Sequence, residues 1–193
     1  MSKIKTVGIV GTGVIGTGWI IRNLAHNKIV HAYDQNKNLK NYVLKEIKRT
    51  SKSIKKLFGK KILIKNLKFF NSLEKALSNV DFVQESVLEN YKVKTDLIQK
   101  ISKYVKSNVI ISSSSSGLLP SKIFSKSKNP QRGIIGHPFN PAYLLPAVEI
   151  VPGKKTTRKF LSDANKYYKS ISMRPIMLKK ELPGYLSDRL QEA

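Results

Sequence analysis

The stretch VGIVGTGVIG, residues 7–16, decides the fold of this chain. It joins a short aliphatic run to a G-x-G-x-x-G pattern. After a strand and before a helix, the first glycine permits a tight turn, the second lets backbone approach a pyrophosphate, and the third lets helix and strand pack closely. The helix start adds free N–H groups and a partial positive charge for phosphates. The loop predicted to hold a dinucleotide consists of Gly11, Thr12, Gly13, Val14, Ile15 and Gly16.

The next predicted strand, IVHAYD at residues 29–34, ends on a carboxylate. Asp34 follows Gly16 by 18 residues. At this place a carboxylate accepts hydrogen bonds from the adenosine ribose hydroxyls and repels a 2′-phosphate, so we expect NAD rather than NADP. The alternative is that the glycines only make a tight turn and that Asp34 only ends a strand.

Short aliphatic runs alternate with amphipathic segments along the whole chain. We expect strands near residues 5–10, 29–34, 67–70, 80–86, 108–114, 132–137, 146–152 and 174–179. We expect helices at residues 14–27, 91–105 and 156–170, and one amphipathic helix in the lysine-rich segment 45–68. Two shorter helices are predicted. One begins after Asn71, which would cap it together with Glu74, and the other begins at Pro120. This order predicts an α/β fold, with a Rossmann-type, mostly parallel sheet that carries helices on both faces.

The stretch GHPFNPAYLLPAVE, residues 136–149, places a histidine in a stiff turn and a glutamate among aliphatic residues. Rossmann sheets bind ligands at the carboxyl ends of their strands. We therefore expect His137, Ser116 and the segment 85–89 to converge there. Glu149 would hydrogen-bond one nitrogen of His137 and leave the other as a base for an alcohol proton, while Ser116 steadies the oxygen. The alternatives are a turn histidine, a surface glutamate and a serine that satisfies backbone groups.

The composition indicates which kinds of binding partner the chain can have. The formal net charge is +24 over 193 residues, from 36 Lys and Arg against 12 Asp and Glu, and 30 of the 36 are lysines spread along the chain. Specific readers of nucleic acid rely on arginine and stacked aromatic rings. We interpret the lysines as solvated surface and expect no specific nucleic-acid partner; a charge-driven binder of nucleic acid or membrane surfaces is the alternative. No apolar run is long enough to cross a membrane.

The chain contains no cysteine. Disulfides and thiolate metal sites are therefore excluded, and we predict no metal site. The absence of cysteine fits a reducing compartment, so we expect a cytoplasmic location.

Five stretches carry a resemblance to a known family: GIVGTGVIG, SVLENYKVK, SSSSSGLLPSKI, GHPFNPAYLLPAVEIV and KELPGYLSDRLQEA. Over nearly its whole length the chain resembles the L-3-hydroxyacyl-CoA dehydrogenase superfamily. The text around VQES, SGLLPSKI and PAYLLPAVE is most similar to the branch with L-carnitine dehydrogenase and the lambda-crystallin type L-gulonate dehydrogenase. The resemblance implies NAD-dependent oxidation of a 3-hydroxy group to a ketone, on a 3-hydroxyacyl thioester or a small 3-hydroxy acid such as carnitine.

The resemblance also implies roles for individual residues. His137 matches the catalytic base, Glu149 its partner, and Ser116 the serine that contacts substrate and nicotinamide. Glu89 and Lys94 match positions that touch NAD; from the residues alone they pass as surface charges at a helix start.

Two departures concern the end of the chain. In PGYLSDRL, Asp188 occupies the catalytic position where the family has asparagine. A carboxylate can only accept hydrogen bonds, whereas an amide also donates, so catalysis needs Asp188 protonated, turned away or tolerated at a lower rate. We expect an NAD-binding Rossmann domain at residues 1–182, and at 183–193 only the first turns of a truncated all-helical domain that would form a homodimer in a full-length relative. The alternative function is an NAD-binding remnant or subunit without its own catalysis.

Overall fold

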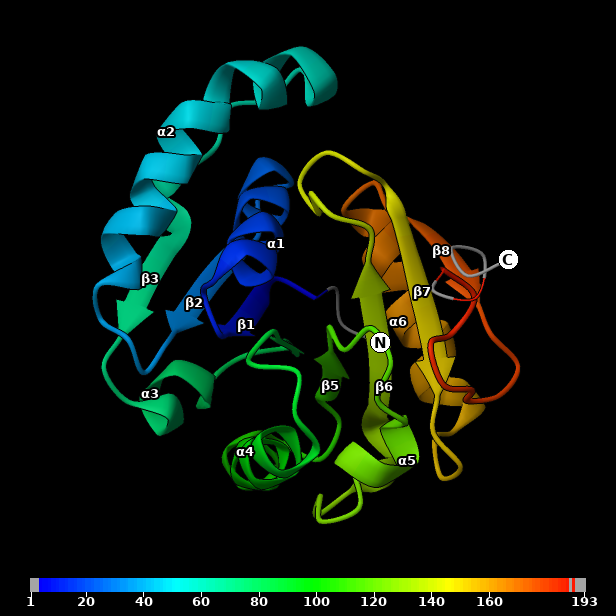
Figure 1. Ribbon diagram of the computed structural model, residues 1–193. Coiled ribbons are helices and arrows are strands. Elements are labelled where there is room, and N and C mark those ends of the chain that lie inside the picture. Colours follow the sequence, from blue (N-terminus) through cyan, green and yellow to red (C-terminus); the bar gives the residue numbers. More distant parts are fainter. Residues whose placement is uncertain (1–3, 188, 190–193) are drawn as a thin grey trace.

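An eight-stranded sheet forms the centre of the computed structural model, which describes residues 4–187 and 189 (Figure 1). The strand order is β3-β2-β1-β4-β5-β6-β7-β8, and neighbouring strands run parallel except for the antiparallel pair β6 and β7. The strands are β1 (Thr6–Val10), β2 (Ile29–Tyr33), β3 (Leu67–Phe70), β4 (Phe82–Glu85), β5 (Ile110–Ser113), β6 (Gly133–Pro138), β7 (Ala147–Pro152) and β8 (Arg174–Met177).

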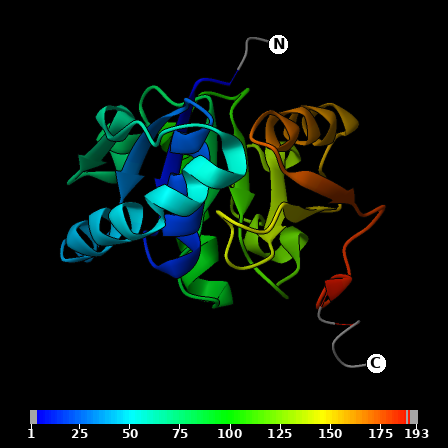
Figure 2. The ribbon, with the colours of Figure 1, turned by 90° about the horizontal axis from the view of Figure 1, so that it is seen from above.

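Helices cover both faces of this sheet (Figures 1 and 2). They are α1 (Val14–Ala25), α2 (Leu39–Phe58), α3 (Leu73–Leu77), α4 (Tyr91–Tyr104), α5 (Pro120–Ile123) and α6 (Arg158–Ser170), with short 3₁₀ turns at Ile64–Asn66 and Pro130–Arg132. Buried residues of α1, α2 and α6 form one hydrophobic cluster, and those of α3, α4 and α5 form a second. The predicted α/β fold, mostly parallel and covered on both faces, is confirmed.

The strand order reverses at β1, which lies between β2 and β4. Strands β2 and β3 lie on one side of β1, and β4 to β8 lie on the other side. A crevice therefore opens beside β1 at the carboxyl ends of the strands, where doubly wound sheets bind their ligands. The glycine loop follows β1 directly, so the fold places it at this crevice.

The lysine-rich segment 45–68 is α-helical only in its first part. Helix α2 ends at Phe58 because Gly59 takes a left-handed conformation with φ of 65°. Val43, Ile47 and Ile54 are buried, whereas Leu57 is 51% exposed and lies outside the apolar stripe. The prediction was therefore right for the amphipathic helix and wrong for its extent.

The predicted cap at Asn71 is also wrong by one residue. Ser72 is the N-cap of α3, and its hydroxyl accepts a hydrogen bond from the backbone N–H of Lys75. Ser72 has the extended backbone that a cap requires, with φ of −130° and ψ of 132°.

The end of the described chain leaves the sheet after β8. Residues 183–186 form turns, and Ser187 and Arg189 have helical backbone. Within residues 4–187 and 189 there is no all-helical second domain. In the same part of the chain, no helix is both long enough and apolar enough to span a membrane.

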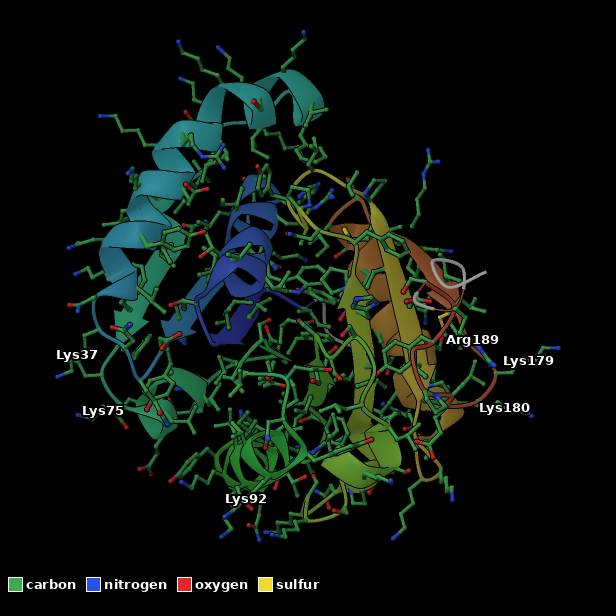
Figure 3. The ribbon with its side chains drawn as sticks, in the orientation of Figure 1. Lys37, Lys75, Lys92, Lys179, Lys180 and Arg189 are labelled. Atoms are coloured by element: carbon green, nitrogen blue, oxygen red, sulfur yellow. The ribbon has the colours of Figure 1, made fainter. Side chains whose placement is uncertain are left out.

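Lysine and arginine side chains extend outward over much of the surface (Figure 3). Those labelled there belong to Lys37, Lys75, Lys92, Lys179, Lys180 and Arg189, and all six residues are exposed. Their positions agree with the interpretation of the lysines as solvated surface. Lys94 is an exception, since only 1% of its side chain is exposed.

Candidate active site

The glycine loop between β1 and α1 is shaped by close backbone contacts. Gly11 has φ of 87°, and a methyl group on it would lie 2.6 Å from the carbonyl oxygen of Ser86. A methyl group on Gly16 would lie 1.9 Å from the carbonyl oxygen of Gly11. Only glycine fits at these two positions, because any side chain would overlap backbone atoms.

Gly13 differs from both, because a methyl group there would meet no atom within 4 Å. Gly13 is also the N-cap of α1, with no side-chain cap, and the first turn of this helix carries no acidic residue. The free N–H groups of the helix start therefore face open space, as a pyrophosphate requires. This open cradle fits the phosphates of NAD.

Asp34, directly after β2, is bound to the same loop. Its Oδ2 accepts hydrogen bonds from the backbone N–H of Thr12 at 2.6 Å and the Thr12 hydroxyl at 3.2 Å, and its Oδ1 accepts from the backbone N–H of Asn36 at 2.9 Å. Gly11, Gly13 and Asp34 line one cavity of about 700 Å³ between the loop and α4. The carboxylate thus lies where the adenosine ribose of NAD would be held.

Replacing Gly13 with valine should weaken NAD binding by more than about tenfold and leave the melting temperature nearly unchanged. The side chain would enter the open cradle without meeting protein atoms. Calorimetric titration with NAD and thermal unfolding measure the two effects. Gly16→Ala is the contrasting variant and should lower the melting temperature as well; NAD binding of Gly13→Val at wild-type strength would contradict this placement.

A histidine–glutamate pair lies at the carboxyl end of β6. His137 is directly opposite Glu149 in the antiparallel register of β6 and β7. The distance from His137 Nδ1 to Glu149 Oε2 is 2.8 Å. Because a carboxylate only accepts, Nδ1 is the donor, and Nε2 of the neutral ring keeps its lone pair. The hydrogen bond predicted between these two residues is confirmed.

Glu149 is fully buried and accepts from the chain end as well as from His137. Its Oε1 accepts from the backbone N–H groups of Leu186 at 2.9 Å and Ser187 at 3.2 Å, and its Oε2 accepts from the Ser187 hydroxyl at 2.8 Å. Burial alone would raise the pKa of Glu149, but the hydrogen bonds from His137, Ser187 and Leu186 outweigh it and hold the pKa below its usual value. The stabilisation from this carboxylate is complete above its ordinary pKa and is lost as pH falls through the lowered one.

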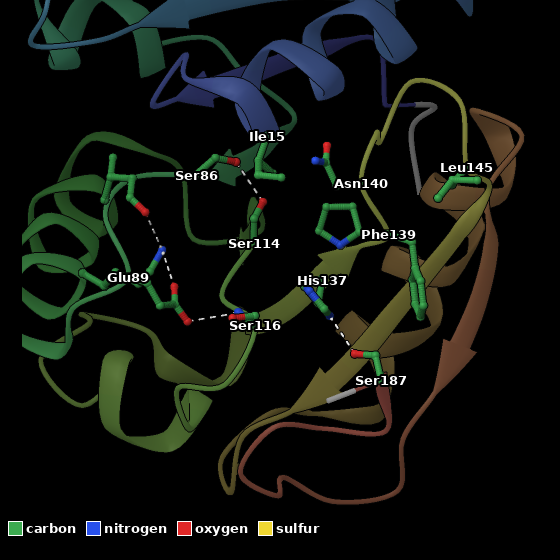
Figure 4. Close-up of a pocket in the computed structure, with 13 residues that line it drawn as sticks. Ile15, Ser86, Glu89, Ser114, Ser116, His137, Phe139, Asn140, Leu145 and Ser187 are labelled. Atoms are coloured by element: carbon green, nitrogen blue, oxygen red, sulfur yellow. Dashed lines mark hydrogen bonds and ion pairs between the residues drawn. The ribbon is translucent and has the colours of Figure 1, made fainter. Parts of the chain in front are cut away.

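His137 faces a cavity of about 500 Å³ (Figure 4). Ser116, Glu89 and Ser187 also line it, so the predicted convergence of His137, Ser116 and the segment 85–89 is confirmed. Among the described residues no group hydrogen-bonds His137 Nε2, which is free to meet a ligand. Ser86 and Val87 line both this cavity and the larger one beside Asp34, so the two cavities meet at these residues.

The loop between β6 and β7 forms one wall of the smaller cavity through Phe139, Asn140 and Leu145, and its Asn140–Pro141 peptide bond is cis. The buried Arg22 of α1 holds this loop: its Nε donates to the carbonyl oxygen of Ala142 at 3.0 Å and its Nη2 to that of Leu145 at 2.8 Å. Burial lowers the pKa of Arg22 to about 10, which keeps the guanidinium charged at neutral pH.

Glu89 and Lys94 belong to a buried cluster rather than to a solvated helix start. Lys94 Nζ lies 2.8 Å from Glu85 Oε1 and 3.5 Å from Glu89 Oε2, and it donates to the carbonyl oxygen of Val87 at 3.1 Å. The surface alternative is therefore wrong for Lys94, while the Glu89 side chain is 39% exposed. Lys94 holds the start of α4 against the end of β4.

Glu89 connects this cluster to the serine run after β5. Its Oε1 accepts from the Ser115 hydroxyl and from the backbone N–H groups of Ser116 at 3.0 Å and Gly117 at 3.3 Å. Burial would raise the pKa of Glu89, but the Ser115 hydroxyl, Lys94 and these backbone groups together hold it below its usual value. Glu89 therefore fixes the backbone that presents the Ser116 hydroxyl to the cavity.

Sequence reasoning missed several residues of the site. Glu85 belongs to the predicted segment 85–89, but its burial and its pairing with Lys94 were not predicted, and Ser187, which completes the contacts of Glu149, was not predicted at all. An acidic residue at the end of an apolar strand, with lysine nine positions later on the next helix, is a signal that could have found the first pair. No local pattern points to Ser187, whose partner is 38 residues away. Asp188, the remaining predicted catalytic residue, lies outside the described residues.

Comparisons with known proteins agree with this geometry. Residues 6–182 match the family of the 3-hydroxyacyl-CoA dehydrogenase, NAD binding domain. The L-carnitine dehydrogenases of Oceanobacillus iheyensis and Pseudomonas putida are each 41% identical, over 98% and 100% of this chain and 62% and 60% of their own length. The solved (S)-3-hydroxybutyryl-CoA dehydrogenase of Ralstonia eutropha is 26% identical with a TM-score of 0.86, covering 98% of this chain and 68% of that one.

The chain spans about three fifths of the length of the curated relatives that it matches, 62% and 60% for the two above. The family match covers almost all of the described fold, including the glycine loop and both residues of the histidine–glutamate pair. The chain belongs to the family of 3-hydroxyacyl-CoA dehydrogenase NAD-binding domains, and its cofactor is NAD.

Proposed function

We propose that this chain carries the NAD-binding and proton-transferring part of a dehydrogenase that oxidises a 3-hydroxy group to a ketone, with L-carnitine as substrate. The observation that carries the proposal is the pair His137 and Glu149. The free Nε2 of His137 faces one cavity, and at Ser86 and Val87 this cavity meets the larger cavity beside the dinucleotide loop. The two relatives named L-carnitine dehydrogenase support the choice of substrate.

Each residue contributes a separate part of the reaction. NAD, when held by the glycine loop and Asp34, would supply the nicotinamide that accepts the hydride from the carbinol carbon. His137 Nε2 takes the hydroxyl proton, and Glu149 keeps Nδ1 protonated and stabilises the imidazolium that forms. The Ser116 hydroxyl donates to the substrate oxygen as negative charge develops on it. Glu89 holds the Ser116 backbone and Lys94 anchors Glu89.

A zwitterion such as carnitine needs a site for its quaternary ammonium group. Such cations bind over aromatic faces. The ring of Phe139 lines the same cavity as His137, with ring centroids 6.1 Å apart. This aromatic wall supports carnitine over a 3-hydroxyacyl-CoA, whose thioester carries no cation at that place.

The experiment is a titration with NAD followed by a turnover assay. Trp19 is the single tryptophan, and its indole N–H donates to the Ser114 hydroxyl, which lines the cavity, so NAD should change its fluorescence saturably. NADH should then form with L-carnitine and more slowly with 3-hydroxybutyryl-CoA. NAD binding without NADH formation on any 3-hydroxy substrate would instead support an NAD-binding remnant or subunit. No response to NAD, together with tight, salt-sensitive binding to RNA, would favour a charge-driven binder.

The homodimer and the cytoplasmic location remain predictions that go with this function. Leu186 is 43% exposed at the end of the described chain and would be available to a partner surface.

A further inference from the structure

A chain of hydrogen bonds runs from the core of the sheet to the junction of the two cavities. Ser114 Oγ is its central atom, because it lies 3.1 Å from Trp19 Nε1, 2.8 Å from Gln84 Nε2 and 2.8 Å from Ser86 Oγ. Trp19 and Gln84 are buried, and Ser86 is partly exposed at the cavity (Figure 4). The mechanism proposed above uses none of these groups.

The orientation of the Gln84 amide is fixed by its other neighbours. One amide atom lies 3.3 Å from the carbonyl oxygen of Gly136, which can only accept, so this atom is the nitrogen. The amide oxygen then accepts from the Tyr168 hydroxyl at 2.7 Å. Gln84 is therefore a donor to Ser114.

The direction of the hydrogen bond between Ser114 and Ser86 follows from the number of lone pairs on the Ser114 hydroxyl. A serine hydroxyl has two lone pairs and one proton. The N–H groups of Trp19 and Gln84 occupy both lone pairs of Ser114, so its proton goes to Ser86. Among the described residues nothing accepts the proton of Ser86, which therefore points into the cavity as a donor.

Ser86 lies beside the glycine loop. Its backbone N–H donates to the carbonyl oxygen of Val10 at 2.7 Å, and its carbonyl oxygen blocks a side chain at Gly11. A dinucleotide with its ribose at Asp34 and its reactive end at His137 must cross this junction, which Ser86 shares with Val87. Ser114, to which the Ser86 hydroxyl is bonded, lines the His137 cavity and not the cavity beside Asp34. The Ser86 hydroxyl therefore lies on the His137 side of the junction, where the nicotinamide end of the ligand would be held.

We propose that the Ser86 hydroxyl, oriented by Ser114, donates a hydrogen bond to the carboxamide oxygen of the nicotinamide and so sets the rotation of the ring in front of His137. Within the carboxamide only the oxygen can accept this proton. Ser86 is thus a cofactor-positioning residue, and its role rests on the NAD site proposed above.

The test compares binding of NADH and ADP-ribose to Ser86→Ala by calorimetry. ADP-ribose keeps both riboses and the pyrophosphate but lacks the nicotinamide. Loss of one hydrogen bond between neutral groups should weaken NADH about 3- to 10-fold and ADP-ribose less than about twofold. In the thionicotinamide analogue of NADH, sulfur replaces the carboxamide oxygen. Ser86→Ala should weaken binding of this analogue by less than about twofold, because sulfur is a weak hydrogen-bond acceptor.

Ser78→Ala is the matched control, since Ser78 is exposed at the end of α3 and its hydroxyl donates only to the carbonyl oxygen of Lys75. Ser78→Ala should leave the affinity for both NADH and ADP-ribose unchanged. Equal weakening of NADH and ADP-ribose in Ser86→Ala would show a ribose contact or a structural role and overturn the proposal, as would unchanged NADH affinity. If the wild-type chain bound neither ligand, the NAD site itself would be refuted, independently of Ser86.

Discussion

Replacing His137 with glutamine is expected to lower turnover of L-carnitine by about 10²- to 10⁴-fold, the usual contribution of a general base. Glutamine is of similar size and its amide N–H groups can still donate to Glu149, so the fold around β6 and β7 should be kept. It has no basic nitrogen to take the hydroxyl proton. The rate of NADH formation measures the loss. Affinity for NAD should stay nearly unchanged, because His137 acts on the hydroxyl proton of the substrate rather than on the cofactor, and it does not line the cavity beside Asp34.

His31→Gln is the control for this substitution. His31 lies on β2, and its Nδ1 is 3.1 Å from the carbonyl oxygen of Ala76, away from both cavities. Turnover should persist in this variant. A parallel loss of turnover and of NAD affinity in His137→Gln would refute the assignment of His137 to the substrate proton. So would wild-type turnover.

Lys94→Met should lower the free energy of unfolding by about 3–5 kcal/mol, the typical cost of removing one partner from a buried ion pair. The substitution keeps a long side chain but leaves the Glu85 carboxylate, which is fully buried, without its cation. In a chain of this size the loss should appear as a decrease of about 10 °C in melting temperature. Denaturant and thermal unfolding measure it.

Lys92→Met is the matched control, because Lys92 lies on the same helix, is exposed and forms no ion pair within the described residues. It should change the free energy of unfolding by less than about 0.5 kcal/mol. Adding Glu85→Gln to Lys94→Met should recover part of the loss, because the neutral amide is cheaper to bury than the unpaired carboxylate. If Lys94→Met were no more destabilising than Lys92→Met, the Glu85–Lys94 pair would not contribute in this way.

Much of the candidate site could be predicted because its signals are local. The glycine spacing, the carboxylate directly after β2 and the histidine at the carboxyl end of β6 each depend on residues close in sequence. The α/β order then brings the ends of parallel strands to one edge of the sheet, so the convergence of Ser116, His137 and the segment 85–89 followed from the fold class. Two helix boundaries were predicted wrongly. The basic, partly apolar pattern continues to Lys68, although Gly59 ends α2, and Asn71 is as suited to a cap as its neighbour Ser72, which begins α3.

Apart from the bond between Glu149 and His137, the partners of the buried polar groups at the site were not predicted. From the sequence, Lys94 is one lysine among 30 on a chain whose lysines are mostly solvated. Its burial depends on where the start of α4 meets the end of β4. Ser114, Ser86 and Ser187 are likewise ordinary serines until Trp19, Gln84 and Glu149 are placed beside them.

The sequence by itself determined the order of strands and helices, the dinucleotide loop and the choice of NAD, because backbone conformation and the hydrophobic pattern act between residues that are near in the chain. Only the tertiary structure decided which groups of the site donate hydrogen bonds and which accept them. The tautomer of His137 and the donor role of Ser86 depend on hydrogen bonds between residues 12 and 28 positions apart, which no local sequence pattern specifies.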